Sequence, residues 1–298
     1  MNNQKCLIVI IGPTATGKTN LSIELANYFN TDVISADSRQ FYKELKIGAA
    51  PPSDEKLKTV KHHFIHHLSI KDNYNAGKYE KECLIKIKNL FEKKDKLILV
   101  GGSRLYINAI TKGIDDIPDT PLKIRNKIIR LYEKEGISSL RKILKEKDPK
   151  YYNQVDLNNQ NRLIRAIEVI YNTDKPFSHF RKNIIKERNF NIIYISIKMD
   201  REEIYNRINI RVDKMIEYGL LNEVKSLLPY RHFNSLQTVG YKELFKYIDG
   251  EFELKDAINK IKQNTRRFAK RQITWLNSEK SVNYFKINEL NKIISFIE

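Results

Sequence analysis

Residues 12–19 read Gly12-Pro13-Thr14-Ala15-Thr16-Gly17-Lys18-Thr19, and the fold is organised around this stretch. It matches G-x-x-x-x-G-K-T, the pattern of a loop (the P-loop) that wraps backbone N–H groups around phosphate oxygens. The apolar run Cys6–Ile11 before it is typical of a buried parallel strand, and the apolar residues from Leu21 to Phe29 recur at helical spacing. The loop therefore joins a strand to a helix N-terminus, where the helix dipole favours an anion. We expect Lys18 to reach the terminal phosphates and the Thr19 hydroxyl to bind Mg²⁺.

The charge balance of the chain indicates a polyanionic partner. Its 298 residues carry 54 Lys plus Arg against 36 Asp plus Glu, a formal net charge of +18. Such an excess favours a nucleic acid as partner. A lysine-rich composition with solvated lysine faces is the open alternative.

The composition also bears on the compartment. With 41% hydrophobic and 30% charged residues, the chain is typical of a globular protein, and no apolar run reaches the length of a membrane span. Residues 1–5 lead into the first apolar run without the features of a signal peptide. Two cysteines, Cys6 and Cys83, do not make a disulfide framework. We therefore expect a cytoplasmic protein that does not contact a membrane.

The next segments place a carboxylate and a glycine pair beside this loop. Val33 to Ala36 can form a second short strand, and Asp37 follows at its carboxyl end. Lys96 to Val100 has the pattern of another buried strand, and it leads into Gly101-Gly102-Ser103 before a helix. Because ligands of open α/β sheets bind at the carboxyl ends of strands, these segments outline one cleft.

Four histidines lie close together, at positions 62, 63, 66 and 67. They suggest a metal site, but no cysteine or carboxylate stands nearby at a familiar ligand spacing. We prefer structural or phosphate-facing roles for them.

The character of the chain changes between residues 116 and 189. Pro118 and Pro121 interrupt the pattern, and helical segments follow without a good strand. This stretch holds 17 Lys plus Arg and 10 Asp plus Glu, and a strand pattern resumes at Asn191 to Ile197. We therefore predict an α/β core in residues 1–115 and 190–298, built on a parallel sheet with flanking helices. An all-helical basic domain is inserted into it at 116–189.

The last hundred residues are expected to be helical. Lys262 to Arg271 hold five basic residues and no acidic one, with Phe268 inside the stretch and Trp275 after it. Basic residues mixed with aromatic ones suit a nucleic-acid surface, where charges meet phosphates and rings stack on bases. A solvated helix whose two aromatic rings pack inward explains the same pattern and stays open.

Several segments, spread over nearly the whole chain, together resemble the tRNA dimethylallyltransferases, also called tRNA isopentenyltransferases. Beside residues 12–19 they read Asp37-Ser38-Arg39-Gln40, His62-His63-Phe64-Ile65, Val100-Gly101-Gly102-Ser103, Asn161-Arg162-Leu163-Ile164-Arg165-Ala166-Ile167-Glu168-Val169, Arg211-Val212-Asp213-Lys214-Met215, Gln237-Thr238-Val239-Gly240-Tyr241 and Thr265-Arg266-Arg267-Phe268-Ala269-Lys270-Arg271-Gln272-Ile273-Thr274-Trp275. Together these motifs are far more specific than the P-loop alone. The zinc finger of eukaryotic relatives is not found in this sequence, so the resemblance is to the bacterial type.

The resemblance implies a P-loop NTPase-like core and a reaction. Dimethylallyl diphosphate gives its five-carbon group to N6 of adenosine 37 of a tRNA, next to the anticodon, and diphosphate leaves. Residues 12–19, with Lys18 and a Mg²⁺ held by Thr19, would stabilise the charge of the leaving diphosphate, and Arg211 would help to hold it. Asp37 matches the general base of the family, which accepts the N6 proton.

For the tRNA, the resemblance carries over residues of both the core and the insertion. They are Asp37, Ser38, Arg39, Gln40, Ser103, Arg125, Asn161, Arg162, Leu163, Ile164, Arg165, Gln237, Thr238, Val239, Gly240, Tyr241, Lys242, Lys270, Arg271 and Gln272. The target base must leave its stack to reach the prenyl donor, and a single-stranded anticodon loop permits this cheaply. The insertion is expected to clamp the anticodon stem-loop, mainly through phosphates, and the protein is expected to act as a monomer.

Other functions share part of these motifs. A P-loop metabolite kinase would have the same loop. However, Gly101 follows the strand pattern Leu97–Val100, at the place where a Walker B strand has Asp. An adenylate dimethylallyltransferase would keep the chemistry, but a mononucleotide needs neither the basic insertion nor residues 262–271. A non-catalytic RNA-binding protein would leave Asp37, Lys18 and Thr19 unexplained. Arg104 and the loop at residues 49–52 depart from the usual family residues, which leaves local ligand contacts open.

Overall fold

A computed structural model gives the fold and describes residues 5–298. Met1–Gln4, which contribute to the expectation that no signal peptide is present, lie outside the described residues. The chain divides into two compact units: a core unit, which runs to Thr111 and resumes at Arg188, and an insertion unit, Lys112–Glu187. The sequence pattern placed the insertion at 116–189. None of the helices in the described part of the chain is long and apolar enough to cross a membrane.

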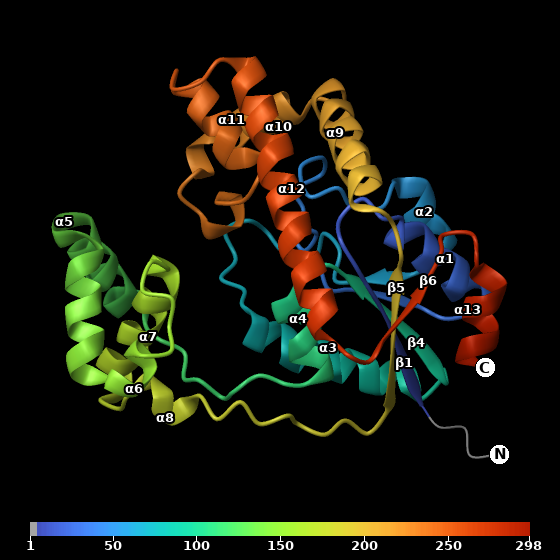
Figure 1. Cartoon of the computed structure of the whole chain (residues 1–298), viewed down its shortest axis with the longest axis horizontal. Helices are drawn as coiled ribbons and strands as arrows, with labels where there is room; N and C mark the ends of the chain where they lie inside the picture. Colours follow the sequence, from blue (N-terminus) through green and yellow to red (C-terminus); the bar gives the residue numbers. More distant parts are fainter. Residues whose placement is uncertain (1–4) are drawn as a thin grey trace. The chain divides into compact units, whose positions relative to one another are not determined.

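The core unit contains a six-stranded parallel sheet in the order β3-β2-β4-β1-β5-β6 (Figure 1). Its strands are β1 (Cys6–Ile11), β2 (Val33–Ser35), β3 (His62–His63), β4 (Lys96–Gly101), β5 (Asn191–Ile197) and β6 (Val282–Phe285). The predicted α/β fold is confirmed. The expectation of a wholly helical last hundred residues is wrong at β6, an edge strand whose residues are only partly buried and so lack a continuous apolar run.

Helices connect these strands and extend the core unit beyond the sheet. They are α1 (Lys18–Tyr28), α2 (Asp54–Thr59), α3 (Ala76–Phe91), α4 (Arg104–Thr111), α9 (Arg201–Glu217), α10 (Leu220–Ser226), α11 (Tyr241–Ile248), α12 (Leu254–Ser278) and α13 (Leu290–Ile297). Two short 3₁₀ turns, at Leu228–Tyr230 and Asn234–Leu236, lie between α10 and α11.

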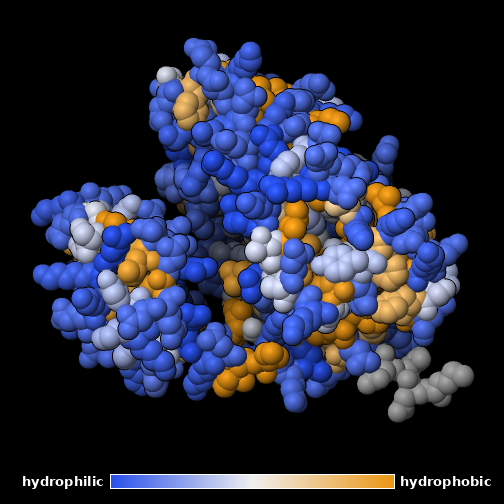
Figure 2. Space-filling view, viewed as in Figure 1, coloured by the Kyte–Doolittle hydropathy of each residue, from blue (hydrophilic) through white to orange (hydrophobic). Residues whose placement is uncertain are grey.

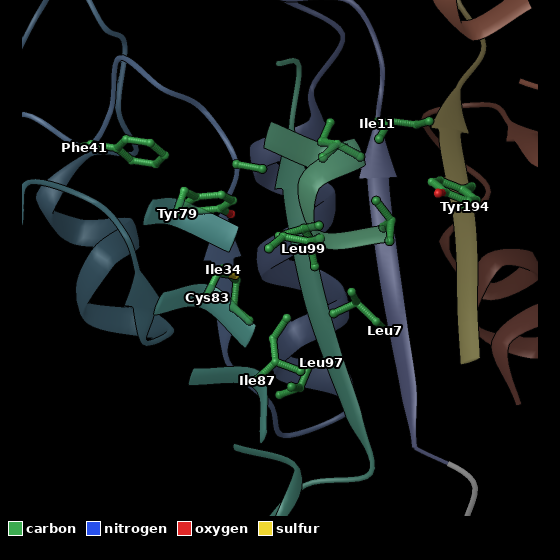
Figure 3. Close-up of a cluster of buried hydrophobic side chains, with 14 of the residues drawn as sticks. Leu7, Ile11, Ile34, Phe41, Tyr79, Cys83, Ile87, Leu97, Leu99 and Tyr194 are labelled. Carbon is green, nitrogen blue, oxygen red and sulfur yellow. The ribbon is translucent and has the colours of Figure 1, made fainter. Parts of the chain in front are cut away.

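Alternation along the central strands gives the sheet two apolar faces. Leu7, Val9 and Ile11 of β1 face one core cluster, which α3, α4 and the end of α12 complete. Figure 3 shows Leu7 and Ile11 with residues of α3 in this cluster. Cys6, Ile8 and Ile10 face the other cluster, which α1 and α13 complete. A strand buried on both faces needs such a continuous apolar run, which is why the sequence revealed it.

A third apolar cluster holds α9–α12 together, and through Leu45 and Ala49 it also fixes the loop after β2. The sheet ends therefore connect to this helical part through residues of the loop that carries Asp37.

The insertion unit is helical and has an apolar cluster of its own. Its helices are α5 (Leu122–Lys147), α6 (Pro149–Tyr152), α7 (Gln160–Thr173) and α8 (Phe177–Phe180). The backbone of α5 leaves the helical conformation at Gly136 (φ 73°), which divides α5 into two helical stretches. Where this unit begins and ends, the backbone N–H of Lys186 donates to the carbonyl of Lys112. Hydrophilic residues dominate the visible surface of both units (Figure 2).

Candidate active site

The P-loop lies between β1 and α1. Gly12 (φ 151°) and Gly17 (φ 95°) adopt positive φ, which glycine does at little cost, so the chain can curl before the helix begins. The buried Thr16 hydroxyl donates to the Pro13 carbonyl at 3.0 Å, which holds the curl closed. Lys18 Nζ donates to the same carbonyl at 2.6 Å, so its amine lies over the loop.

Three cationic side chains, those of Lys18, Arg39 and Arg211, lie beside this loop. Arg211, from α9, donates to Thr14 Oγ1 at 3.1 Å and to the Ala50 carbonyl at 3.4 Å. Burial, followed by the charge of Arg211, lowers the pKa of Lys18 to about 8. Burial, followed by the charge of Arg39, lowers the pKa of Arg211 to about 10. Mutually repelling, desolvated cations are what a site for a polyvalent anion requires.

Asp37 lies two residues after β2, at the same sheet edge as the P-loop, and its charge opposes the lowering of both pKa values. Its Oδ1 accepts from the backbone N–H of Arg39 at 3.1 Å and lies 3.9 Å from Arg39 Nε. Gln40 accepts from Ser35 Oγ at 3.0 Å and donates to the Ala50 carbonyl at 3.1 Å. Gln40 thus braces the loop with both ends of its amide, whereas Asp37 remains partly exposed.

A cavity of about 920 Å³ opens beside Asp37 and the P-loop, within the size range of small-molecule sites. Its walls come from five stretches of the core unit and include Thr14, Asp37, Ser38, Arg39, Gly102, Ser103, Arg104, Leu105, Tyr106, Gln237, Thr238, Val239, Lys242, Phe268, Arg271, Gln272, Thr274 and Trp275. One end is therefore polar and cationic, and aromatic and aliphatic side chains line much of the rest.

The Gln272 side chain, 5% exposed, ties the walls of this cavity together. Its Oε1 accepts from the backbone N–H of Thr14 at 2.9 Å, and its Nε2 donates to the Gly102 carbonyl at 2.8 Å. The Gln272 amide is thus engaged inside the protein, and the contact of this residue with tRNA stays a prediction. Trp275 packs inward, as the alternative for α12 proposed, and its buried indole N–H has no hydrogen-bond partner among residues 5–298.

The predicted tRNA contacts of the last hundred residues fall into two groups. Lys242, Lys270 and Arg271 are exposed, and Gln237–Val239 line the cavity. Tyr241 is fully buried and donates its hydroxyl to Glu223 at 2.7 Å, and the Gly240 N–H donates to Glu243 at 2.8 Å. The Tyr241 ring therefore belongs to the core, and an RNA contact of this residue stays a prediction.

The insertion unit divides its predicted contacts in the same way. Asn161 and Arg162 are exposed at the start of α7, but Leu163 and Ile164 are buried in the apolar cluster, which corrects the expectation for their side chains. Arg125 and Arg165 both donate to the buried Glu168, at 2.9 and 2.6 Å. The Arg125 contact joins α5 to α7, whereas Arg165 pairs with Glu168 within α7 and also donates to the Pro118 carbonyl at 3.2 Å.

No cluster of three or more His, Cys, Asp or Glu side chains that could hold a metal ion occurs among residues 5–298. His63 instead pairs with Asp32 at 2.8 Å at the sheet edge. The Thr19 hydroxyl near the start of α1 fits a different arrangement, in which Mg²⁺ takes one protein ligand and the remaining oxygens from a phosphate group and water.

The chain matches known proteins over most of its length. The IPP transferase family model matches residues 40–279. A tRNA dimethylallyltransferase 2 of Azobacteroides pseudotrichonymphae is 51% identical, over 97% of this chain and 94% of the relative. This chain belongs to the tRNA dimethylallyltransferase family. It is a transferase, and the family predicted from the motifs is confirmed.

The fold of this chain also matches solved structures of the tRNA dimethylallyltransferase family. The crystal structure of a tRNA isopentenylpyrophosphate transferase from Bacillus halodurans superposes with a TM-score of 0.72, at 34% identity, and the match covers 99% of this chain and 96% of that one. A eukaryotic dimethylallyltransferase acting on tRNA gives a TM-score of 0.75 at 27% identity, with 96% of this chain and 75% of that one covered.

Glu223 and Tyr106 are site residues that the sequence motifs did not single out. Tyr106 lines the cavity from α4, and Glu223 binds the loop at residues 47–48 from α10. The role of Glu223 is seen only from its contact with Gly48, which lies 175 residues away in the sequence. No local sequence pattern could therefore have indicated it.

Proposed function

We propose that this chain transfers the dimethylallyl group from dimethylallyl diphosphate to N6 of adenosine 37 in tRNA and releases diphosphate. One observation carries the proposal: a single cavity borders both Thr14 of the P-loop, with Arg39 beside it and Arg211 bound to it, and the partly exposed carboxylate of Asp37. A polyphosphate needs the first feature, and removal of a proton from an amine needs the second.

The diphosphate end of the reaction rests on the P-loop residues Gly12–Thr19. Cleavage of the allylic C–O bond leaves negative charge on the diphosphate, and Lys18, Arg211 and the loop N–H groups stabilise that charge as it develops. Mg²⁺, when bound at the Thr19 hydroxyl, offsets part of the same charge.

The acceptor end rests on Asp37. The N6 amine of adenine forms a bond to the allylic carbon as the C–O bond breaks, and its extra proton must then leave. Asp37 takes this proton as general base. The apolar walls of the cavity shield the cationic allylic carbon from water, which would otherwise compete for it.

The tRNA is bound by basic and polar surfaces of both units. In the core unit these are Lys242, Lys270 and Arg271 with the cavity residues Ser38, Arg39, Ser103 and Gln237–Val239, and in the insertion unit they are Asn161 and Arg162. Their contacts to phosphate would position the anticodon stem-loop, while the cavity receives the flipped base. Action as a monomer in the cytoplasm completes the proposal.

The test is a single incubation of the purified protein with Mg²⁺, dimethylallyl diphosphate and an unmodified anticodon stem-loop RNA. Digestion and mass spectrometry of the nucleosides should then reveal an adenosine that carries one additional dimethylallyl group. Parallel reactions contain AMP or ATP in place of the RNA. Product with AMP alone would indicate a mononucleotide acceptor, and ATP consumption without prenylation would indicate a kinase, so either result refutes the proposal.

A further inference from the structure

The Glu223 carboxylate holds a turn of the chain far from it in sequence. Glu223 lies on α10, and its Oε2 accepts from the backbone N–H of Ile47 at 2.7 Å. Its Oε1 accepts from the backbone N–H of Gly48 at 3.0 Å and from the Tyr241 hydroxyl at 2.7 Å. One carboxylate therefore receives three hydrogen bonds, which are stronger than neutral ones because the acceptor is ionised.

The turn has little freedom to adopt another position. A Cβ added at Gly48 would lie 2.5 Å from Tyr241 Oη, so the chain passes directly over the buried ring. The turn closes with a hydrogen bond from Ala50 N–H to the Ile47 carbonyl at 2.9 Å, and Ala50 has a left-handed φ of 48°. A non-glycine residue persists in this conformation only where its surroundings hold it. Glu223 and Tyr241 supply such surroundings.

The carbonyls of this turn face the cations of the diphosphate site. Ala50 accepts from Arg211 Nη2 at 3.4 Å and from Gln40 Nε2 at 3.1 Å, and Gly48 accepts from Arg39 Nη1 at 3.5 Å. The charge of Arg39 adds to burial in lowering the pKa of Arg211, so the two cations lie together only if nearby oxygen atoms offset the repulsion. The two long contacts orient the guanidinium groups and still leave them free to move toward an anion.

We propose that Glu223 is a positioning residue for diphosphate binding. It fixes the turn at residues 47–50, whose carbonyl oxygens direct Arg39 and Arg211 toward the P-loop. It touches neither substrate, and the inference rests on the proposed function because it takes the anion to be a diphosphate.

The test is the affinity of the full-length Glu223→Gln variant for inorganic diphosphate in the presence of Mg²⁺, measured by isothermal titration calorimetry. Glutamine keeps the shape but presents an NH₂ group to a backbone N–H, so one arm of the contact is lost. We expect binding to weaken about tenfold to hundredfold, as for misplaced charge-assisted hydrogen bonds. Glu217→Gln, the same change on an exposed residue at the end of α9, serves as the matched control and should bind like the wild type.

A second measurement separates positioning from general damage. In an Arg211→Gln background, Glu223→Gln should weaken diphosphate binding by a clearly smaller factor than in the wild type, because Arg211 is one of the groups it acts through. A destabilised protein would instead lower the binding stoichiometry without changing the dissociation constant. Glu223→Asp, which keeps the charge but cannot reach both N–H groups, replaces Glu223→Gln if that variant does not fold, and several-fold weaker binding is expected.

The outcomes distinguish this inference from the proposed function. A wild type that binds diphosphate while Glu223→Gln, or Glu223→Asp in its place, binds equally tightly overturns the inference alone. So does an undiminished effect in the Arg211→Gln background. A wild type that does not bind diphosphate at all overturns the proposed function, and this inference with it.

Discussion

The ion pair between Glu80 and Arg188 gives the most direct test of the fold. It joins α3 to the first residue of the core unit after the insertion, and the two side chains are only 8% and 10% exposed. Arg188 Nη2 donates to Glu80 Oε1 and to the Ala109 carbonyl, both at 2.8 Å, and Nε donates to the Ile110 carbonyl at 2.7 Å. Glu80→Ala leaves a buried guanidinium with only the two carbonyls as partners.

The expected cost of Glu80→Ala is about 3 kcal/mol, the lower end of the range for breaking a buried ion pair, because those two hydrogen bonds remain. Arg188→Met should cost more, about 4–5 kcal/mol, since it strands both a carboxylate and two carbonyls. Glu80→Ala combined with Arg188→Met should cost less than the sum of the two single changes, because no charge is left unpaired.

Urea unfolding monitored by Trp275 fluorescence measures these costs. Trp275 is the single tryptophan of the sequence and is buried in the core unit, so its emission follows that unit even if the insertion unfolds separately. Lys88→Ala, an exposed change on the same helix, should stay within about 0.5 kcal/mol of the wild type. A cost of less than about 1 kcal/mol for Glu80→Ala would refute the reasoning, since water would then have to solvate the pair.

Three further predictions concern the site. Asp37→Asn should lower the rate of prenyl transfer by about 10²–10⁴ and change tRNA affinity much less, because it removes a general base, and a near-normal single-turnover rate would contradict that role. Burial lowers the pKa of Lys18 to about 8, so diphosphate affinity should fall as the pH rises above about 8, where Lys18 must take up a proton before it pairs with the anion. Calorimetry measures this proton uptake on binding, and Lys18→Met should abolish it. Arg162→Ala should weaken tRNA binding and reduce the slope of the log binding constant against log salt concentration by about 1. Arg165→Ala, which loses a contact to Glu168, should mainly lower the melting temperature of the protein. Equal slopes for Arg162→Ala and the wild type would count against the RNA contact of Arg162.

The sequence predicted the central sheet because its physical signal is local. β1 is an apolar run that is buried on both faces, β5 is mostly apolar and buried from Tyr194 to Ile197, and the P-loop pattern locates the turn after β1. β3 consists of two partly buried histidines and β6 of partly buried residues at the sheet edge, so neither carries that signal. An edge strand forms because the neighbouring strand offers hydrogen bonds to it. The sequence of the edge strand alone does not show this.

The site could be predicted where its residues follow the ends of strands, because those strands have a local sequence signal. Asp37 and the P-loop meet because the carboxyl ends of parallel strands share an edge. Gln272, by contrast, looked like one more polar residue of a basic helix, yet it bonds to Thr14 across 258 positions. Tyr241 and Leu163 belong to motifs of the family, but burial gives their side chains a packing role. Motifs locate a segment, and the burial of each side chain depends on contacts with distant ones.

The division of the core unit into two stretches of chain sets an order of events during synthesis. β1 lies between β4 and β5, but the ribosome passes from Gly101 to Asn191 before β5 exists, an interval of roughly 5–20 s at ordinary elongation rates. The apolar cluster of the insertion is complete within that interval, whereas one edge of β1 has no strand to pair with. A nascent chain in this state offers an open apolar edge to any passing strand, so the yield of native protein should depend on how quickly translation delivers β5.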